Sequence, residues 1–212
     1  RRRSCLFKLY VFGVYGLMKL IWYKEPWEHF EVENFLSEGE LQDVRDYFST
    51  LSVPDGKVGK NKLGRYRHNT YVYPDHPEIH NDICKMLSKK FIRLLRGTSA
   101  KWDHNTDEIH IEFDRIYPGF KWPIHNDMWT KRVSFILHIS EHGHGTRLYQ
   151  NADGSGTKRT VNWIPGGGGG FVRSDISHHS FDTLDDNSVR QTVILTSRVK
   201  NANTKYNKRT KI

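Results

Sequence analysis

Residues 131–139 read Lys-Arg-Val-Ser-Phe-Ile-Leu-His-Ile and decide the fold class. Apolar side chains occupy every second position of this stretch, which is the period of a β-strand with one face in a core. A similar alternation recurs over residues 109–113 and 189–195. Turns rich in glycine and proline separate these segments, as at Pro118-Gly119. We therefore expect several short strands over residues 105–198.

The N-terminal half carries helical signals instead. Ser37 and Glu40 have the spacing of a capping box, and apolar residues follow them at helical intervals. A second helix is expected to have Pro77 in its first turn and to end at Gly97. The basic, glycine-containing stretch 53–69 is expected to be a mobile loop between the helices, either a solvated connection or a lid over a substrate.

Helices first and short strands afterwards predict a mostly β chain with flanking helices and a jelly-roll or barrel-like core. The length of 212 residues favours a single domain. We expect a leader at 1–17, the domain at 18–198 with its helical flank at 37–97 and jelly-roll core at 105–198, and a basic tail at 199–212. The leader is either additional upstream sequence or, with the apolar run to Tyr23, a membrane anchor.

The positive charge lies at the two ends of the chain. The formal net charge is +9, yet residues 18–197 carry 23 basic and 24 acidic side chains. A nearly neutral body argues against nucleic acid as a partner, although the basic tail keeps that partner open. The only cysteines, Cys5 and Cys84, exclude a disulfide scaffold and suit a reducing compartment, so we expect a cytoplasmic protein.

His125-Asn126-Asp127 is the first candidate for chemistry. On a strand, residues i and i+2 point to the same side, so the histidine and the carboxylate can hold one metal ion. The same His-Asn-Asp motif occurs at residues 80–82. It lies in the expected second helix, where its histidine and aspartate side chains point in different directions and cannot share a metal ion. A third ligand can come from His178-His179 on a distant strand. Two histidines and one carboxylate leave positions open on the metal, as in non-haem Fe(II) oxygenases.

Arg190 follows on the next expected strand, and Thr192 faces the same way. A guanidinium binds a carboxylate through two parallel hydrogen bonds, and a neighbouring hydroxyl adds a third. An arginine that points into a barrel without an anionic partner would be costly. We therefore expect these two residues to anchor the far carboxylate of a chelating co-substrate.

The order of these motifs resembles the 2-oxoglutarate and Fe(II)-dependent dioxygenases, in particular their prolyl-4-hydroxylase-like branch. The resemblance covers roughly residues 108–198, and the Trp27 to Tyr47 segment is similar to the usual lead-in. The matching segments are Tyr117-Pro118-Gly119, His125-Asn126-Asp127, Arg132 to Leu137, Gly145 to Tyr149, Pro165 to Gly170, His179 to Leu184, and Arg190-Gln191-Thr192.

Three features depart from the family pattern. Thr183 replaces a common proline, the Gly166 to Gly170 turn has five glycines, and His178 precedes His179. The last departure makes the distal metal ligand ambiguous. We choose His179 because Phe181 and Leu184 then occupy the apolar positions of the family.

The resemblance implies a double-stranded β-helix, cupin-like fold and a hydroxylase activity. The residues implied to hold Fe(II) are His125, Asp127 and His179, and those implied to bind 2-oxoglutarate are Arg190, Thr192, Tyr117 and Tyr149. With O2, such an enzyme converts 2-oxoglutarate to succinate and CO2 while it hydroxylates a C–H bond. A peptidyl proline or another amino-acid side chain is the implied substrate, and other small molecules stay open.

Several further residues have two interpretations each. Trp122 and Trp129 can line the substrate mouth or pack in the core, and Arg65 and Arg67 of the basic loop can select an acidic or polar substrate. The histidines at 138, 142 and 144 are expected to be solvated turn residues, with adventitious metal binding as the alternative.

Two rival functions accompany the hydroxylase hypothesis. One is a non-catalytic cupin-type module that binds a metal or a ligand. The other is a nucleic-acid-modifying dioxygenase with the same chemistry, although Arg198 does not fit the arginine spacing of the alkylation-repair branch well.

Overall fold

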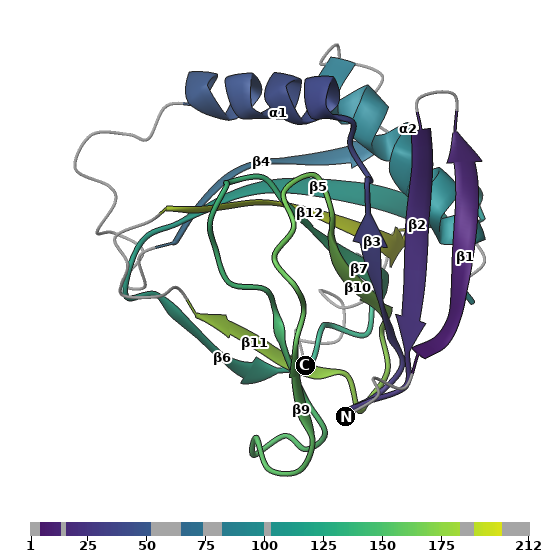
Figure 1. Ribbon diagram of the computed structural model, residues 1–212, viewed down its shortest axis with the longest axis vertical. Coiled ribbons are helices and arrows are strands. Elements are labelled where there is room, and N and C mark those ends of the chain that lie inside the picture. The colour runs from purple at the N-terminus through teal and green to yellow at the C-terminus, as the bar shows by residue number, and fades with distance from the viewer. Residues whose placement is uncertain are drawn as a thin grey trace, which may run out of the picture.

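The structure is a computed structural model that describes residues 5–13, 16–51, 65–73, 82–99, 103–182 and 189–200. Within these ranges, two antiparallel sheets form the framework (Figure 1). The larger sheet has the order β1 (Cys5–Gly13), β2 (Gly16–Tyr23), β3 (His29–Glu33), β10 (Gly168–Val172), β7 (Lys131–His138), β12 (Arg190–Val199), β5 (Asp107–Ile116) and β4 (Arg65–Tyr73). The smaller sheet has the order β6 (Lys121–His125), β11 (His178–Asp182), β8 (Arg147–Tyr149) and β9 (Lys158–Thr160). The predicted mostly β class with a jelly-roll core is confirmed.

Two helices, α1 (Glu38–Thr50) and α2 (Asp82–Arg96), cover the outer face of the larger sheet (Figure 1). The capping box is formed as predicted: the hydroxyl of Ser37 accepts from the backbone N–H of Glu40, and the Glu40 carboxylate accepts from the N–H of Ser37. Helix α2 ends directly before Gly97, also as predicted. The expected helix start near Pro77 lies outside the described residues.

The main core lies between these helices and the larger sheet. The apolar positions of β5, β7 and β12 point toward the helices, and each fully buried large side chain contributes about 1.5–3 kcal/mol. The principal contacts come from Val44, Phe48, Leu87, Phe91, Ile111, Phe113, Phe135, Leu137 and Val193. Most alternate positions of the same strands are polar and face the smaller sheet, and many of them are buried as well. The functional site forms among these polar positions.

The glycine run at 166–170 is mostly strand, which corrects the expected turn. The turn is confined to Pro165 and Gly166, and Gly168 to Gly170 lie in β10 between β3 and β7. A side chain at Gly168 would overlap the backbone carbonyl of Ile136, and one at Gly170 would come within 2.5 Å of the Phe30 ring. These glycines therefore permit close contacts between strands and rings.

The expectation of a basic loop over residues 53–69 is also partly wrong. Residues 65–69 belong to β4, which pairs antiparallel with β5 along most of its length. The strand tolerates the charges of Arg65 and Arg67 because both guanidiniums bond to the buried carboxylate of Asp114 on β5. Residues 52–64, the remainder of the expected loop or lid, lie outside the described residues.

Near the N-terminus, β1 pairs antiparallel with β2 at the edge of the larger sheet. Strand β2 begins at Gly16 and crosses the expected boundary between residues 17 and 18. No helix in the described part of the chain is long and apolar enough to cross a membrane. The division of the chain at residue 17 and the cytoplasmic location stay predictions.

The close approach at Gly168 gives a stability test. Gly168→Ala should lower the free energy of unfolding by about 1–3 kcal/mol, because the new methyl group must displace backbone of β7. Gly39→Ala is the matched control: nothing lies within 4 Å of its added carbon, and it should be neutral or stabilise α1 by up to about 1 kcal/mol. Urea unfolding measures both, and equal stability of the two variants would contradict the packing argument.

Candidate metal centre

The pairing of β6 with β11 in the smaller sheet brings two distant histidines together. His125 at the end of β6 is the register partner of His179 on β11, and their ring centroids lie 4.3 Å apart. Asp127 follows β6 and completes the group: one ligand atom from each of the three side chains lies within 4.8 Å of the others. This spacing is compatible with a single metal ion between them.

His178, the alternative ligand, points elsewhere. Neighbouring residues of a strand project to opposite faces, so His178 and His179 cannot both face His125. The metal-compatible group in the described residues includes His179 and omits His178. His178 instead lies opposite Tyr149 of β8.

Both imidazoles of the group are oriented in the same way. The Nδ1–H of His125 donates to the carbonyl of Pro123 over 3.0 Å, and that of His179 donates to Ser177 over 2.9 Å. The indole N–H of Trp122 donates to Nε2 of His125 over 3.3 Å, so this Nε2 carries a lone pair. Metal-binding histidines commonly hold a backbone carbonyl with the other ring nitrogen. This pattern leaves Nε2 of His179 for a metal, whereas a metal at Nε2 of His125 would take the place of the Trp122 N–H.

His179 is neutral at physiological pH. Burial lowers its pKa to about 4, and the nearby His125 acts in the same direction, while the carboxylate of Asp127 opposes them. The imidazole therefore stays unprotonated well below pH 7. A neutral imidazole is the form that binds a metal.

Asp127 is held from the larger sheet. The Lys131 ammonium and the Ser134 hydroxyl each donate to a different oxygen of its carboxylate over 2.5 Å. Burial alone would raise the pKa of Asp127, but the charge of Lys131 and the contact with His179 outweigh it, and the pKa is lowered. The carboxylate is ionised, and each oxygen keeps a further lone pair for a metal ion.

The three residues open into a cavity of about 360 Å³ between the two sheets. Its wall combines apolar, acidic and basic side chains from β4, β5, β6, β7, β11 and β12. The charged lining residues are Arg65, Arg67, Glu112, Asp127, Lys131, Arg190 and Arg198. Cations outnumber carboxylates in this wall, so the cavity favours anionic ligands.

Arg190, which also lines the cavity, is a buried cation. Its Nε–H donates to the carbonyl of His144 over 3.0 Å, and Nη1 contacts the Thr192 hydroxyl at 3.5 Å. Its Nη2 has no hydrogen-bond partner among the described residues. Burial lowers its pKa to about 9, although the carboxylate of Asp114 partly opposes this. An anionic ligand would supply the missing partner.

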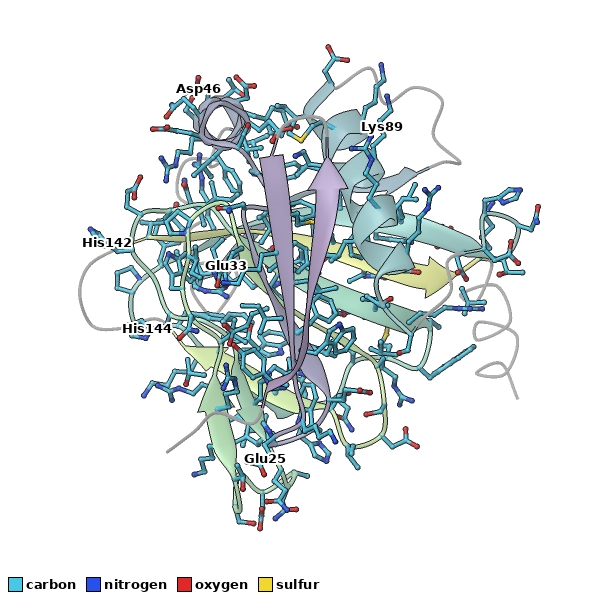
Figure 2. The ribbon with its side chains drawn as sticks, turned by 45° about the vertical axis from the view of Figure 1, so that its right-hand side comes forward. Glu25, Glu33, Asp46, Lys89, His142 and His144 are labelled. Carbon is cyan, nitrogen blue, oxygen red and sulfur yellow. The ribbon has the colours of Figure 1, made fainter. Side chains whose placement is uncertain are left out.

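His138 is a functional candidate that the sequence analysis missed. It is fully buried at the end of β7, which corrects the expectation of a solvated turn residue. The N–H of Ile164 donates to its Nδ1 over 3.2 Å, so Nε2 carries the hydrogen, and this group has no partner among the described residues. His142 and His144, in contrast, lie at the edge of the molecule (Figure 2).

His138 lies beside Arg190 and Thr192. It is the register partner of Thr192 in the pairing of β7 with β12. The His138 and Arg190 side chains also approach the same Trp163 ring, with centroid distances of 4.1 and 5.3 Å. Burial and the positive charge of Arg190 lower the pKa of His138 well below its usual range, so the imidazole is a neutral donor. Its place on the face of β7 that also carries Ser134 was the available signal.

The remaining predicted residues divide into two groups. Trp122, Arg65 and Arg67 line the cavity as expected. Trp129 is 54% exposed and is not part of the cavity wall.

The two tyrosines predicted to help bind 2-oxoglutarate are not in the cavity wall either. The Tyr149 hydroxyl bonds to Ser180 over 2.9 Å, and Ser180 projects from the face of β11 opposite to His179. Tyr117 follows β5 at its turn into β6 and is half-buried. The residue pattern identified both tyrosines but could not show on which side of the sheet they lie.

Comparison with known proteins shows that the fold is shared. No protein-family model and no curated protein matches this sequence. A prolyl-4-hydroxylase from Pseudomonas putida superposes with a TM-score of 0.52 at 17% identity, over 80% of this chain and 92% of that one. The viral collagen prolyl hydroxylase from Paramecium Bursaria Chlorella virus-1, solved as a 2-oxoglutarate complex, gives 0.54 at 12% identity, over 80% and 94%. HygX from Streptomyces hygroscopicus, solved with nickel and 2-oxoglutarate, gives 0.57 at 10% identity, over 82% and 83%.

The geometry predicts which histidine of the adjacent pair a metal needs. His179→Ala should weaken Mn(II) binding by more than the roughly 10–100-fold loss typical of changes around a metal site, because it removes a ligand itself. His178→Ala, the neighbouring control, should bind Mn(II) like the unmodified protein. Calorimetric titration of the metal-free proteins measures both affinities. A larger loss in the His178 variant would reassign the ligand.

Proposed function

We propose that this protein is an Fe(II)- and 2-oxoglutarate-dependent dioxygenase that hydroxylates a C–H bond and releases succinate and CO2. One observation carries the proposal: a single cavity contains both a metal-compatible His-Asp-His group and a buried arginine with an unpartnered donor. The fold that the chain shares with solved prolyl hydroxylases supports the same class.

His125, Asp127 and His179 would hold the iron. The three side chains offer two imidazole nitrogens and one carboxylate oxygen as metal ligands. This set is typical of non-haem Fe(II) enzymes, in which other coordination positions stay open. Iron and 2-oxoglutarate, when bound, supply the oxygen chemistry. The Lys131 and Ser134 contacts to Asp127 fix the direction of its carboxylate. The Nδ1 contacts of the two histidines fix their rings in the same way.

Arg190, Thr192 and His138 would bind the far carboxylate of 2-oxoglutarate. Arg190 and His138 each have a buried donor nitrogen that lacks a partner among the described residues, and Thr192 lies between them in the register. A carboxylate accepts several such bonds at once and would neutralise the buried guanidinium. Tyr149 is no longer part of the proposed co-substrate site, because its hydroxyl bonds to Ser180 on the face of β11 opposite to His179. Tyr117, Thr192 and His138 do not line the cavity wall, and we keep the last two because the pairing of β7 with β12 places them beside Arg190.

The proposed substrate is a small molecule or a peptide, with a peptidyl proline or another amino-acid side chain as the leading class. Trp122 and Met128 line the cavity next to the metal ligands and supply apolar surface for a C–H-bearing group. The names of the structural neighbours, two of which are prolyl hydroxylases, agree with such a substrate.

An anaerobic titration tests the function directly. Fe(II) and then 2-oxoglutarate should give a visible charge-transfer band, which should vanish on addition of O2 as succinate forms. Arg190→Ala should bind Fe(II) normally but weaken 2-oxoglutarate by roughly 10–100-fold, because a charge-assisted carboxylate contact contributes about 1.5–3 kcal/mol. Iron binding without a band would refute the co-substrate site. Absence of iron binding would favour the non-catalytic module.

His138 gives a second, independent test of the co-substrate site. His138→Phe keeps an aromatic ring against Trp163 but removes the Nε2–H donor, and it should weaken 2-oxoglutarate by roughly 5–10-fold, as expected for one hydrogen bond. The thermal stabilisation of the metal-loaded protein by 2-oxoglutarate reports this affinity. His142→Phe, at an exposed site, should leave the stabilisation unchanged. An unaltered response of the His138 variant would remove it from the site.

A further inference from the structure

The cavity contains a second group of arginines that the proposed metal and co-substrate sites do not use. Arg67 comes from β4 and Arg198 from β12, and these strands lie on either side of β5. Both side chains reach toward Glu112 of β5, and all three line the cavity wall. Two cations from separate strands therefore meet over one carboxylate on the inner face of the larger sheet.

The two arginines are held in defined orientations. Nη1 of Arg67 lies 2.7 Å from one oxygen of the Glu112 carboxylate, and Nη2 of Arg198 lies 3.1 Å from the other. The Nε–H of Arg67 also donates to Asp114, and that of Arg198 donates to the Thr196 hydroxyl, over 3.0 and 3.1 Å. These contacts use two nitrogens of each guanidinium, and a guanidinium has three. The arginines are thus preorganised and retain donors for another anion.

Cations outnumber carboxylates in this part of the cavity wall. Arg65, Arg67 and Arg198 line it, and Glu112 is the carboxylate that lines it beside them in the described residues. The carboxylate of Asp127 does not compensate the arginines, because it is paired with Lys131. Bound Fe(II) and doubly charged 2-oxoglutarate would together add no net charge.

The excess charge is accessible from outside. The Arg67 side chain is 39% exposed, whereas Glu112 beneath it is 6% exposed. Arg67 lines the same cavity as His125, Asp127 and His179. A ligand that bonds to Arg67 from inside this cavity would therefore share it with the metal centre.

We propose that Arg67 and Arg198 bind an anionic group of the substrate, a carboxylate or a phosphate, and so direct the rest of the molecule toward the metal centre. This inference rests on the proposed function. The 360 Å³ cavity lies at the small end of the range for ligand sites, so the part of the substrate that enters it is small: a small anionic molecule, or one residue of a peptide together with a nearby anionic group. Glu112 acts as an internal counter-ion that positions both arginines.

Acetate and methylphosphonate are suitable probes because they are small ligands that carry a carboxylate and a phosphonate, which is a close analogue of a phosphate. The protein is loaded with Mn(II) and saturating 2-oxoglutarate, which occupies Arg190, and each probe is titrated by calorimetry. Arg67→Ala and Arg198→Ala should each weaken probe binding by about ten-fold or more, because each removes a charge-assisted contact. The probe that binds more tightly identifies the substrate group.

Glu112→Gln gives a change of opposite sign. It removes the internal competitor for the two guanidiniums, so it should tighten probe binding, whereas a purely structural network would predict weaker binding. Arg159→Ala is the matched control. It breaks an ion pair between an arginine and the buried carboxylate of Glu31, and neither residue is part of the cavity wall. The control should bind the probes normally.

Three results would overturn the inference. They are no probe binding by the unmodified protein, binding by the Arg67 and Arg198 variants that equals that of the unmodified protein, or a loss in the Arg159 control as large as that in these two variants. If a single alanine variant does not fold, the Arg67→Lys and Glu112→Gln proteins carry the test. The charge-transfer band is a separate readout. A normal band without probe binding overturns only this inference, and a missing band overturns the proposed function.

Discussion

The buried carboxylate of Asp127 joins the two sheets, and the proposed site depends on this interaction. Asp127 follows a strand of the smaller sheet, but its two oxygens are held by Lys131 and Ser134 of β7 in the larger sheet. The chain after β6 is therefore fixed to both walls of the cavity. Because His125 lies two residues earlier, in register with His179, the same contacts set the separation of all three ligand groups.

The sequence was most informative where one face of a strand packs in the main core. Alternation identified β5, β7 and β12 because residues such as Phe113 and Phe135 must face the helices. The same alternation placed Arg190 and Thr192 on one side, where the structure has them in contact. What alternation cannot show is the state of the opposite face. It is polar yet buried, and its stability comes from partners far away in the chain, as in the bond between Arg65 and Asp114.

The errors have the same origin. Glycine disfavours strands on average, and only the positions of Ile136 and Phe30 explain why β10 requires it. The charges of β4 suggested a loop because their carboxylate partners lie on another strand. His138 was grouped with His142 and His144 by sequence, whereas strand pairing groups it with Thr192. Local patterns predicted the elements, and the pairings between elements determined which side chains share the cavity.

Burial distinguishes the two proposed anion sites. Arg190 is 2% exposed and lies beside the neutral donor of His138, so an anion there would interact in a low-dielectric setting, with little screening by salt. Arg67 is partly exposed and already shares two carboxylates, so an anion there would compete with internal partners and with dissolved ions. The inner site should therefore retain a co-substrate firmly, while the outer site should exchange its ligand readily. The proposed reaction consumes 2-oxoglutarate and must release succinate as well as the hydroxylated product, so both sites exchange ligands in each turnover. The slower exchange expected at the inner site follows from the depth at which each arginine lies.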